Sequence, residues 1–396
     1  MEKFGRGDLE QTIMLGGNKK ARRAYGFDEV ALVPSALSVD PRDVDTAWTL
    51  GRHRFAIPIV ASAMDAAVNP RVAAEMTRLG GFAVLNAEGL QTRYEDAEGI
   101  LQEIAEAGPE GIIEKMQKIY AAPVRDDLLA RRIQEIKALG GFAAVAAIPP
   151  NAPRLAAVAV EAGADLFVVS SQVATARHFS THAETVDLAR FCRDSPVPVM
   201  VGNCVSFQGA SELMEAGASA LLVGVGPGAI CTTRTVLGIG VPQVTAVADC
   251  AAARDLYHER TGRYVPLLAD GGIKNGGDLA KAIAAGADAV MLGSSVAACS
   301  EAPAPGYSWG MAMSNADLPR GTRIKVSVMG TLREILLGPA HRDDGTMNLV
   351  GALRLSMATC GALTLREMQQ AEMVVAPQIQ TEGKSMQRAQ HVGQGR

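Results

Sequence analysis

The sequence predicts an α/β fold, a (β/α)8 TIM barrel, on three observations. The chain has 396 residues, which is long for a single domain unless that domain is a barrel. Helical segments repeatedly end in a glycine doublet or in Ala-Gly-Ala, and glycine is the usual residue just beyond a helix. Each of these endings precedes a short apolar run typical of strands buried on both faces. Such a barrel predicts an active site at the carboxyl ends of its strands.

Eight short apolar runs are the predicted barrel strands. In chain order they occupy residues 57–62, 82–86, 142–147, 165–170, 197–202, 219–224, 265–270 and 288–293. Helical material separates most of them, as a parallel barrel requires. We expect one catalytic domain over residues 1–375, without an inserted second domain, and a flexible polar tail over residues 376–396.

Three connections are longer than a barrel needs. Between the second and third strands, residues 87–141 form a predicted helical insertion with helices over 100–107, 111–119 and 126–139. After the sixth strand, a glycine-rich loop leads into a predicted helix over 246–261. After the eighth strand, residues 297–329 are rich in proline, glycine and methionine. We expect this last segment to form a lid over the site.

Composition and charge argue against several classes of protein. The formal net charge is −4 and aromatic residues make up 4% of the chain, which argues against nucleic acid as a partner. The first residues lack the apolar core of a signal peptide, and no run of ~18 apolar residues occurs. We therefore expect no membrane contact and a cytoplasmic location. The six cysteines include no C-x-x-C pair, which argues against a structural zinc site and a disulfide framework.

The most glycine-rich stretch follows the sixth strand and contains one cysteine, Cys231. Residues 223–247 are VGVGPGAICTTRTVLGIGVPQVTAV, so Thr232, Thr233 and Arg234 come directly after the thiol. Glycines allow the backbone to approach a ligand closely. A thiol beside hydroxyl groups and a cation fits an activated nucleophile. The alternative is a glycine-rich turn in which Cys231 is a small buried residue.

Glycines and a carboxylate lie at the ends of the last two strands. Gly271-Gly272 and Gly293-Ser294 follow strands seven and eight, where barrels commonly bind phosphate through backbone N–H groups. Each pair is also compatible with an ordinary tight turn. Asp270 could accept two ribose hydroxyls, or it could cap a helix. Together these residues predict a nucleoside monophosphate site with Cys231 beside the base.

Several segments resemble one enzyme family. GVGPGAICTTR, followed by GIGVPQ, is similar to the catalytic loop of the IMP dehydrogenase and GMP reductase family. Other similar segments are YGFDEVALVPS, IPIVASAMDAAVNP, LADGGIKNGGDLAKAIAAGADAVMLGS and LVGALRLSMATCGA. Only residues 90–140 and the far tail fall outside the resemblance.

The resemblance implies an oxidoreductase that acts at carbon 2 of a purine monophosphate (GMP, IMP or XMP). Cys231 would form a covalent thioimidate with that carbon, and Thr233 would belong to the activating pair. The expected substrate-binding residues are Ser62, Met64, Asn203, Asp270 for the ribose, Gly271, Gly272, Gly293 and Ser294 for the phosphate, and Met311 and Ala312 for the base edge. The family uses NAD or NADPH without a Rossmann domain and forms tetramers, so we expect a homotetramer.

The resemblance also implies a potassium site made of backbone carbonyls. Gly226, Gly228 and Cys231 match the carbonyl positions that bind a monovalent cation in the dehydrogenases. Potassium is commonly held by several carbonyl oxygens, and the glycine-rich loop has many of them.

Three departures from the family pattern bear on substrate and cofactor. The dehydrogenases carry paired CBS domains between strands two and three, whereas residues 87–141 are too few for such a pair. Ala229 stands where the family loop has serine. Ser170 and Ser171, in VVSSQVATARH, replace an aspartate motif that contacts the cofactor ribose. With Arg177 and His178 nearby, this stretch favours NADPH, unless it is only a loop with exposed basic residues.

The predicted lid departs from the pattern as well. It lacks the Arg-Tyr pair with which the dehydrogenases activate water, and Arg320 stands where GMP reductase has a catalytic glutamate. Glu301 and Asp317 are nearby carboxylates that could replace that glutamate or could be solvated loop charges. We therefore favour an NADPH-dependent GMP reductase. The alternatives are an IMP dehydrogenase that uses NAD, and a catalytically silent nucleotide-binding regulator.

Overall fold

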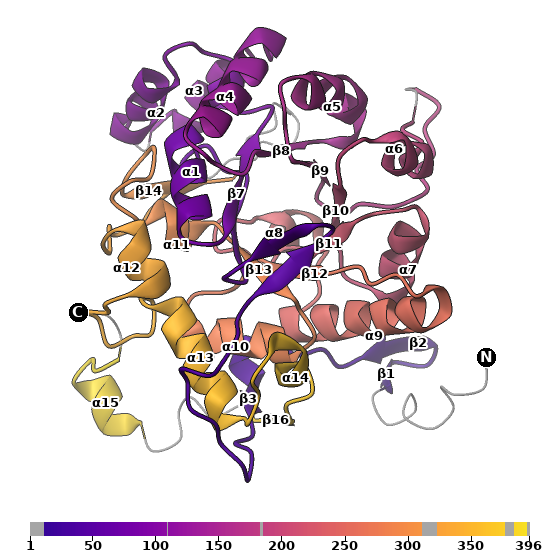
Figure 1. Ribbon diagram of the computed structural model, residues 1–396, viewed down its shortest axis with the longest axis vertical. Helices are drawn as coiled ribbons and strands as arrows, with labels where there is room; N and C mark the ends of the chain where they lie inside the picture. Colours follow the sequence, from indigo (N-terminus) through magenta and orange to yellow (C-terminus); the bar gives the residue numbers. More distant parts are fainter. Residues whose placement is uncertain (1–11, 109, 183–184, 311–322, 377–383, 394–396) are drawn as a thin grey trace.

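A computed structural model of the chain describes residues 12–108, 110–182, 185–310, 323–376 and 384–393. Eight parallel strands close into a barrel surrounded by helices, so the predicted fold class is confirmed (Figure 1). The barrel strands are β6 (Ile59–Ala61), β7 (Phe82–Asn86), β8 (Ala144–Ala147), β9 (Leu166–Ser170), β10 (Val199–Cys204), β11 (Ala220–Val223), β12 (Leu267–Asp270) and β13 (Ala289–Leu292). Strand β13 pairs with β6 and closes the barrel.

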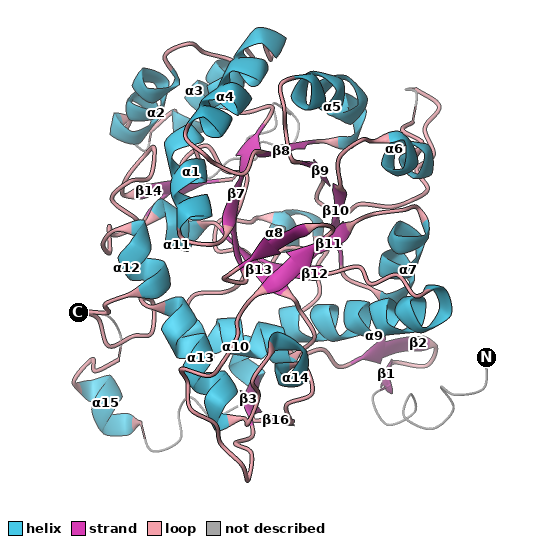
Figure 2. Ribbon diagram, in the orientation of Figure 1, coloured by secondary structure: helices cyan, strands magenta, loops and turns pink. Residues whose placement is uncertain are grey.

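Helices outside the barrel cover the strands (Figure 2). Seven of them are α1 (Pro70–Arg78), α5 (Ala152–Glu161), α6 (Leu188–Asp194), α7 (Phe207–Glu215), α9 (Gln243–Thr261), α10 (Gly276–Ala284) and α13 (Leu349–Thr359). Gly163 and Gly217 follow α5 and α7 with φ of +93° and +98°, a conformation that favours glycine. The glycine signals used to place the strands therefore mark real helix ends.

An aromatic cluster fills the amino-terminal end of the barrel. The hairpin β4 (Trp48–Leu50) and β5 (His53–Phe55) brings Phe55 against Phe82 and Phe142, with ring centroids 4.7 and 5.2 Å apart. Trp48 joins the cluster and donates from Nε1 to the carbonyl of Ile57 at 3.0 Å. This end lies opposite the predicted site, and its apolar packing serves stability.

The segment between β7 and β8 is helical. It contains η2 (Leu90–Thr92), α2 (Ala97–Glu106), α3 (Ile112–Tyr120) and α4 (Asp126–Ala138). Helices α2 and α3 share a second, smaller core with the strand β14 (Tyr307–Trp309), which pairs with β15 (Arg323–Lys325). The insertion therefore packs against part of the segment that follows the eighth barrel strand, as Figure 1 shows beside β14.

The chain ends add small elements around the barrel. They are β1 (Thr12–Leu15), β2 (Lys19–Arg22), η1 (Phe27–Glu29), β3 (Val30–Leu32), α12 (Leu332–Leu337), α14 (Leu365–Met368), β16 (Met373–Val375) and α15 (Ser385–Ala389). Strand β16 pairs with β3. Helix α15 lies in the segment for which we expected only a flexible tail, and the backbone N–H of Gly393 donates to Asp343 at 2.9 Å. Within the described residues, no helix has both the length and the apolar character needed to cross a membrane.

Candidate active site

The carboxyl ends of the barrel strands surround two adjoining cavities of about 680 and 800 Å³. Both cavities are lined by Ser62, Met64, Gly228, Ile230, Asp270 and Gly271, so they form one continuous groove. The first cavity also contains the predicted phosphate residues Gly272, Gly293 and Ser294. The second also contains Ser170, Ser171, Asn203, Gly226, Cys231 and Thr233. The structure thus brings together the described residues that the sequence assigned to substrate, cofactor and nucleophile.

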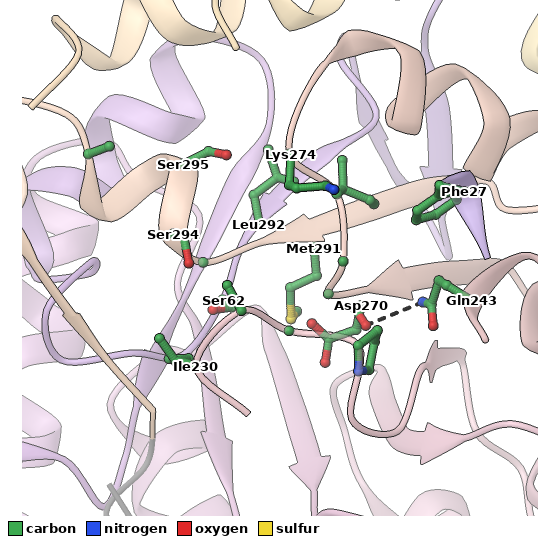
Figure 3. Close-up of a pocket in the computed structure, with 18 of the residues that line it drawn as sticks. Phe27, Ser62, Ile230, Gln243, Asp270, Lys274, Met291, Leu292, Ser294 and Ser295 are labelled. Atoms are coloured by element: carbon green, nitrogen blue, oxygen red, sulfur yellow. Dashed lines mark hydrogen bonds between the residues drawn. The ribbon is translucent and has the colours of Figure 1, made fainter. Parts of the chain in front are cut away.

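Backbone groups form much of the first cavity. Gly271 and Gly272 have φ of +85° and +82°, so the turn after β12 needs glycine. A side chain at Gly293 would approach the hydroxyl oxygen of Ser62 to 3.1 Å. Figure 3 shows Ser62 and Ser294 near one another at the ends of neighbouring strands, on the same side of the cavity. This end of the groove has the small residues and exposed backbone that an oxyanion such as phosphate requires.

Asp270 is a half-buried carboxylate that lines both cavities. Burial raises its pKa to about 6, and the hydrogen bond from Asn203 acts in the opposite direction. Asn203 Nδ2 donates to Asp270 Oδ2 at 2.7 Å, which is the hydrogen bond that this carboxylate makes among the described residues. An ionised carboxylate here can accept hydrogen bonds from a vicinal diol.

Gln243 joins the ends of β11 and β12, and the sequence did not point to it. Its Nε2 donates to the carbonyl of Val223 at 2.6 Å and to the carbonyl of Asp270 at 3.3 Å (Figure 3). Its position in VPQ, just after the glycine-rich loop, was the only signal that could have found it. The side chain holds Asp270 at the groove through its backbone and leaves the carboxylate free.

Cys231 lies in a hydrogen-bonded cluster with two other side chains. Its Sγ lies 3.2 Å from Thr233 Oγ1, to which the thiol donates, and Gln172 Nε2 donates to the same oxygen at 3.0 Å. Thr233 is buried at the start of α8 (Thr233–Leu237), whereas Cys231 is exposed to the groove. Because the Gln172 amide occupies a lone pair of Thr233, the hydroxyl proton can point to the sulfur once the thiol ionises. Gln172 was missed, although it directly follows the predicted strand end Ser170-Ser171.

The end of β9 and the loop after it form one wall of the second cavity. We had assigned two residues of this wall, Ser170 and Ser171, to cofactor binding. Ser170, Ser171 and His178 line this cavity. Arg177 does not line the cavity and pairs with Glu212 at 2.6 Å. The choice between NAD and NADPH therefore stays a prediction that rests on Ser170, Ser171 and His178.

Arg234 lies beside the loop that we expected to bind potassium. Arg234 packs so closely that a side chain at Gly226 would collide with it, and it donates to the carbonyl of Val241 at 2.8 Å. The carbonyl of Gly228 accepts the N–H of Cys231 at 3.0 Å. These contacts engage the Gly228 carbonyl within the loop, and no step of the proposed chemistry depends on potassium. The described residues also contain no cluster of three His, Cys, Asp or Glu side chains that could bind a metal.

The predicted lid is described only in part. Met311, Ala312, Asp317 and Arg320 lie outside the described residues. Glu301 lies within them and accepts the N–H of Leu332 at 3.0 Å, so it holds the start of α12 and is not a groove residue. Gly310, at the end of β14, lines the second cavity.

The fold and the groove together define a class of protein. A (β/α)8 barrel with an exposed thiol, a partly buried carboxylate and two glycine turns at its strand ends has the arrangement of an enzyme active site. Comparison with known proteins then places the chain. The model of the IMP dehydrogenase / GMP reductase domain matches residues 24–313. The chain therefore belongs to the IMP dehydrogenase / GMP reductase family, whose members are NAD(P)-dependent oxidoreductases.

Relatives and solved structures agree with this assignment. An uncharacterized oxidoreductase of Mycobacterium tuberculosis is 41% identical over 372 residues, which cover 92% of this chain and 99% of that protein. An inosine-5'-monophosphate dehydrogenase of Methanocaldococcus jannaschii is 28% identical over 92% of this chain and 95% of its own length. The crystal structure of an IMP dehydrogenase/GMP reductase-like protein from Corynebacterium glutamicum superposes with a TM-score of 0.88 at 35% identity, covering 93% of this chain and 98% of that one.

Proposed function

We propose that this enzyme oxidises or reduces carbon 2 of a purine nucleoside monophosphate through a covalent bond to Cys231. One observation carries the proposal: the cluster of Cys231, Thr233 and Gln172 opens onto the same groove as Asp270 and the glycine turns. A thiol that must reach a purine ring needs the ribose and phosphate held at a fixed distance from it. The groove supplies a candidate group for each of these parts of the ligand.

The phosphate and the ribose of the nucleotide would anchor it in the groove. Backbone N–H groups of Gly271, Gly272, Gly293 and Ser294 would hold the phosphate. The ribose hydroxyls would donate to Asp270, which Asn203 orients. The base would then lie over Met64 with its carbon 2 near Cys231, because both residues line the second cavity.

The residues around Cys231 suit addition and later departure of a thiolate. The sulfur electron pair forms the bond to carbon 2, and the ring nitrogen receives the displaced electrons. Thr233, with its oxygen already bonded to the Gln172 amide, can donate its own proton to the ionised sulfur. When bound, the nicotinamide cofactor would accept or supply the hydride. Ser170 and Ser171, in the second cavity, would contact it.

Two reaction directions are candidates, and the first is oxidation of IMP to XMP with NAD. The inosine-5'-monophosphate dehydrogenase of Methanocaldococcus jannaschii named above aligns with 92% of this chain, which supports this direction. One observation keeps the reduction of GMP to IMP and ammonia as a second candidate. The sequence has no Arg-Tyr pair after residue 300 with which to activate water, and the reductive direction needs no water.

An absorbance assay at about 340 nm separates these possibilities. IMP with NAD should raise the signal, whereas GMP with NADPH would lower it if the second candidate is right. Cys231→Ala should abolish turnover and keep nucleotide binding, while Cys192→Ala, a half-buried thiol on α6, should behave as wild type. Full turnover by Cys231→Ala would refute the covalent mechanism. Nucleotide binding without turnover in any combination would indicate a silent regulator instead.

A further inference from the structure

One buried hydroxyl joins two walls of the groove. Tyr120 Oη, at the end of α3 in the helical insertion, donates to Asp65 Oδ2 at 2.6 Å and accepts from Trp309 Nε1 at 2.9 Å. Asp65 belongs to the loop after β6, and Trp309 ends β14. We infer that Tyr120 is a positioning residue, which holds these two walls in the arrangement that nucleotide binding needs. The inference rests on the proposed function of the groove.

The first wall is the loop that contains Ser62 and Met64, both of which line the two cavities. Asp65 comes directly after Met64 and is buried. Its second oxygen accepts the N–H of Leu90 at 3.0 Å, and any side chain at Gly89 would collide with the carboxylate. Asp65 is thus enclosed by the insertion, and a displacement of its carboxylate would move Met64 as well.

The second wall is the two-stranded sheet of β14 and β15. The Trp309 side chain is fully buried, and the next residue, Gly310, lines the second cavity. Arg323 on β15 donates to the carbonyls of Ala105 and Ala107 at 2.8 and 2.7 Å, at the end of α2. Its guanidinium also lies 4.7 Å from the ring centroid of Tyr307. Both strands are therefore fastened to the same insertion.

The packing of the Tyr120 ring does not require the two hydrogen bonds of its hydroxyl. Its ring lies in the small core formed by Leu101, Ile104, Met116 and their neighbours, and a phenylalanine ring would fill nearly the same space. The hydroxyl adds nothing to that apolar contact. Both of its partners lie outside the insertion, one on each wall of the groove, so its bonds act between elements and not within α3.

Tyr120→Phe removes these bonds and nearly preserves the core, and the chain offers a matched control. Tyr94 packs on the same core, and its hydroxyl donates to the carbonyl of Ile119 at 2.8 Å, within the insertion itself. We expect Tyr120→Phe to raise the KM for the nucleotide about tenfold, because both buried hydrogen bonds between the two walls are lost. Tyr94→Phe should change the KM by less than about twofold, although both variants unfold at a somewhat lower temperature. A Tyr120→Phe enzyme whose KM matches that of Tyr94→Phe would overturn the inference.

A binding measurement separates this inference from the proposed reaction. The chain has two tryptophans, so in a Trp48→Phe background the emission comes from Trp309 alone and reports on IMP or GMP binding. If wild type binds a nucleotide without turnover, the reaction is wrong, but the loss of affinity in Tyr120→Phe still tests the positioning role. If Tyr120→Phe fails to fold, Asp65→Asn and Trp309→Phe each alter one side of the link and should each weaken binding; isothermal titration calorimetry measures the affinity of these two variants, because Trp309→Phe removes the emitting residue. Unchanged affinity in both, or no binding by wild type, would refute the role.

Discussion

Replacing Asn203 by leucine should shift the pH range over which the enzyme binds its nucleotide. In the wild type, burial raises the pKa of Asp270 to about 6, and the hydrogen bond from Asn203 partly offsets that burial. The proposed role of Asp270 is to accept ribose hydroxyls, which needs the ionised carboxylate. In the wild type, kcat/KM should therefore fall about tenfold for each pH unit below about 6. Above that pH it should be level.

The size of the shift follows from the bond that is lost. A hydrogen bond to a charged group contributes about 1.5–3 kcal/mol, and one pKa unit corresponds to about 1.4 kcal/mol. Without the Asn203 amide, the pKa of Asp270 should rise by about one to two units. The acidic limb of kcat/KM should then move to between about pH 7 and 8. At about pH 9 the variant should approach wild type, because Asp270 is ionised in both proteins.

The measurement is kcat/KM for the nucleotide between pH 5 and 9 at fixed ionic strength, with nucleotide affinity measured in parallel. Gln243→Leu is the matched control, because it also removes an amide beside Asp270 but one that contacts only the backbone carbonyl of that residue. Its acidic limb should stay near that of wild type. If the acidic limb of kcat/KM in Asn203→Leu stays at the pH of wild type, the ionisation of Asp270 does not govern binding. A limb that moves in both variants would point to a general loosening of the groove.

Three further changes test other parts of the structure. Gln172→Leu should lower kcat about tenfold with little change in the nucleotide KM, because the Thr233 hydroxyl is no longer oriented toward Cys231. It should also slow the alkylation of Cys231 by iodoacetamide, and unchanged alkylation would refute this role. Gly272→Ala, at φ of +82°, should cost about 1 kcal/mol of folding stability and weaken inhibition by inorganic phosphate, which a competition assay would detect. Phe55→Ala should lower the free energy of unfolding by about 3–5 kcal/mol in a denaturant titration, with the KM unchanged, because its ring packs at the opposite end of the barrel.

The eight barrel strands could be predicted because their signal is local. Each is a short apolar run directly after a helix that ends in glycine, so a few neighbouring residues determine the assignment. The hairpin over residues 48–55 and the pairs β3–β16 and β14–β15 were missed. Their strands are three residues long, and two of the pairs join residues far apart in the chain. Short strands of this kind are stabilised by the surfaces on which they pack, which the sequence does not display.

The site was predictable to the extent that it follows the strand ends. Asp270 and the glycine turns could be placed because a barrel presents these positions at one rim. Gln172 and Gln243 could not, since their roles arise from contacts with Thr233 and Val223 across the groove. Arg177 illustrates the same limit. It is close in sequence to the predicted cofactor loop, but its side chain pairs with Glu212 and does not line the cavity. Sequence proximity located the loop and did not determine the direction of its side chains.

In this barrel, the connection between the second and third strands is a helical insertion that supports the walls of the groove. Where the family's dehydrogenases are expected to carry regulatory domains, this chain has three helices, of which α2 and α3 pack on β14 and Tyr120 of α3 bonds Asp65. A regulatory pair could be removed without altering the walls of the groove, whereas these helices form part of their support. Truncating α2 and α3 should therefore impair nucleotide binding as well as stability. In this chain the insertion is better understood as part of the catalytic domain than as an addition to it.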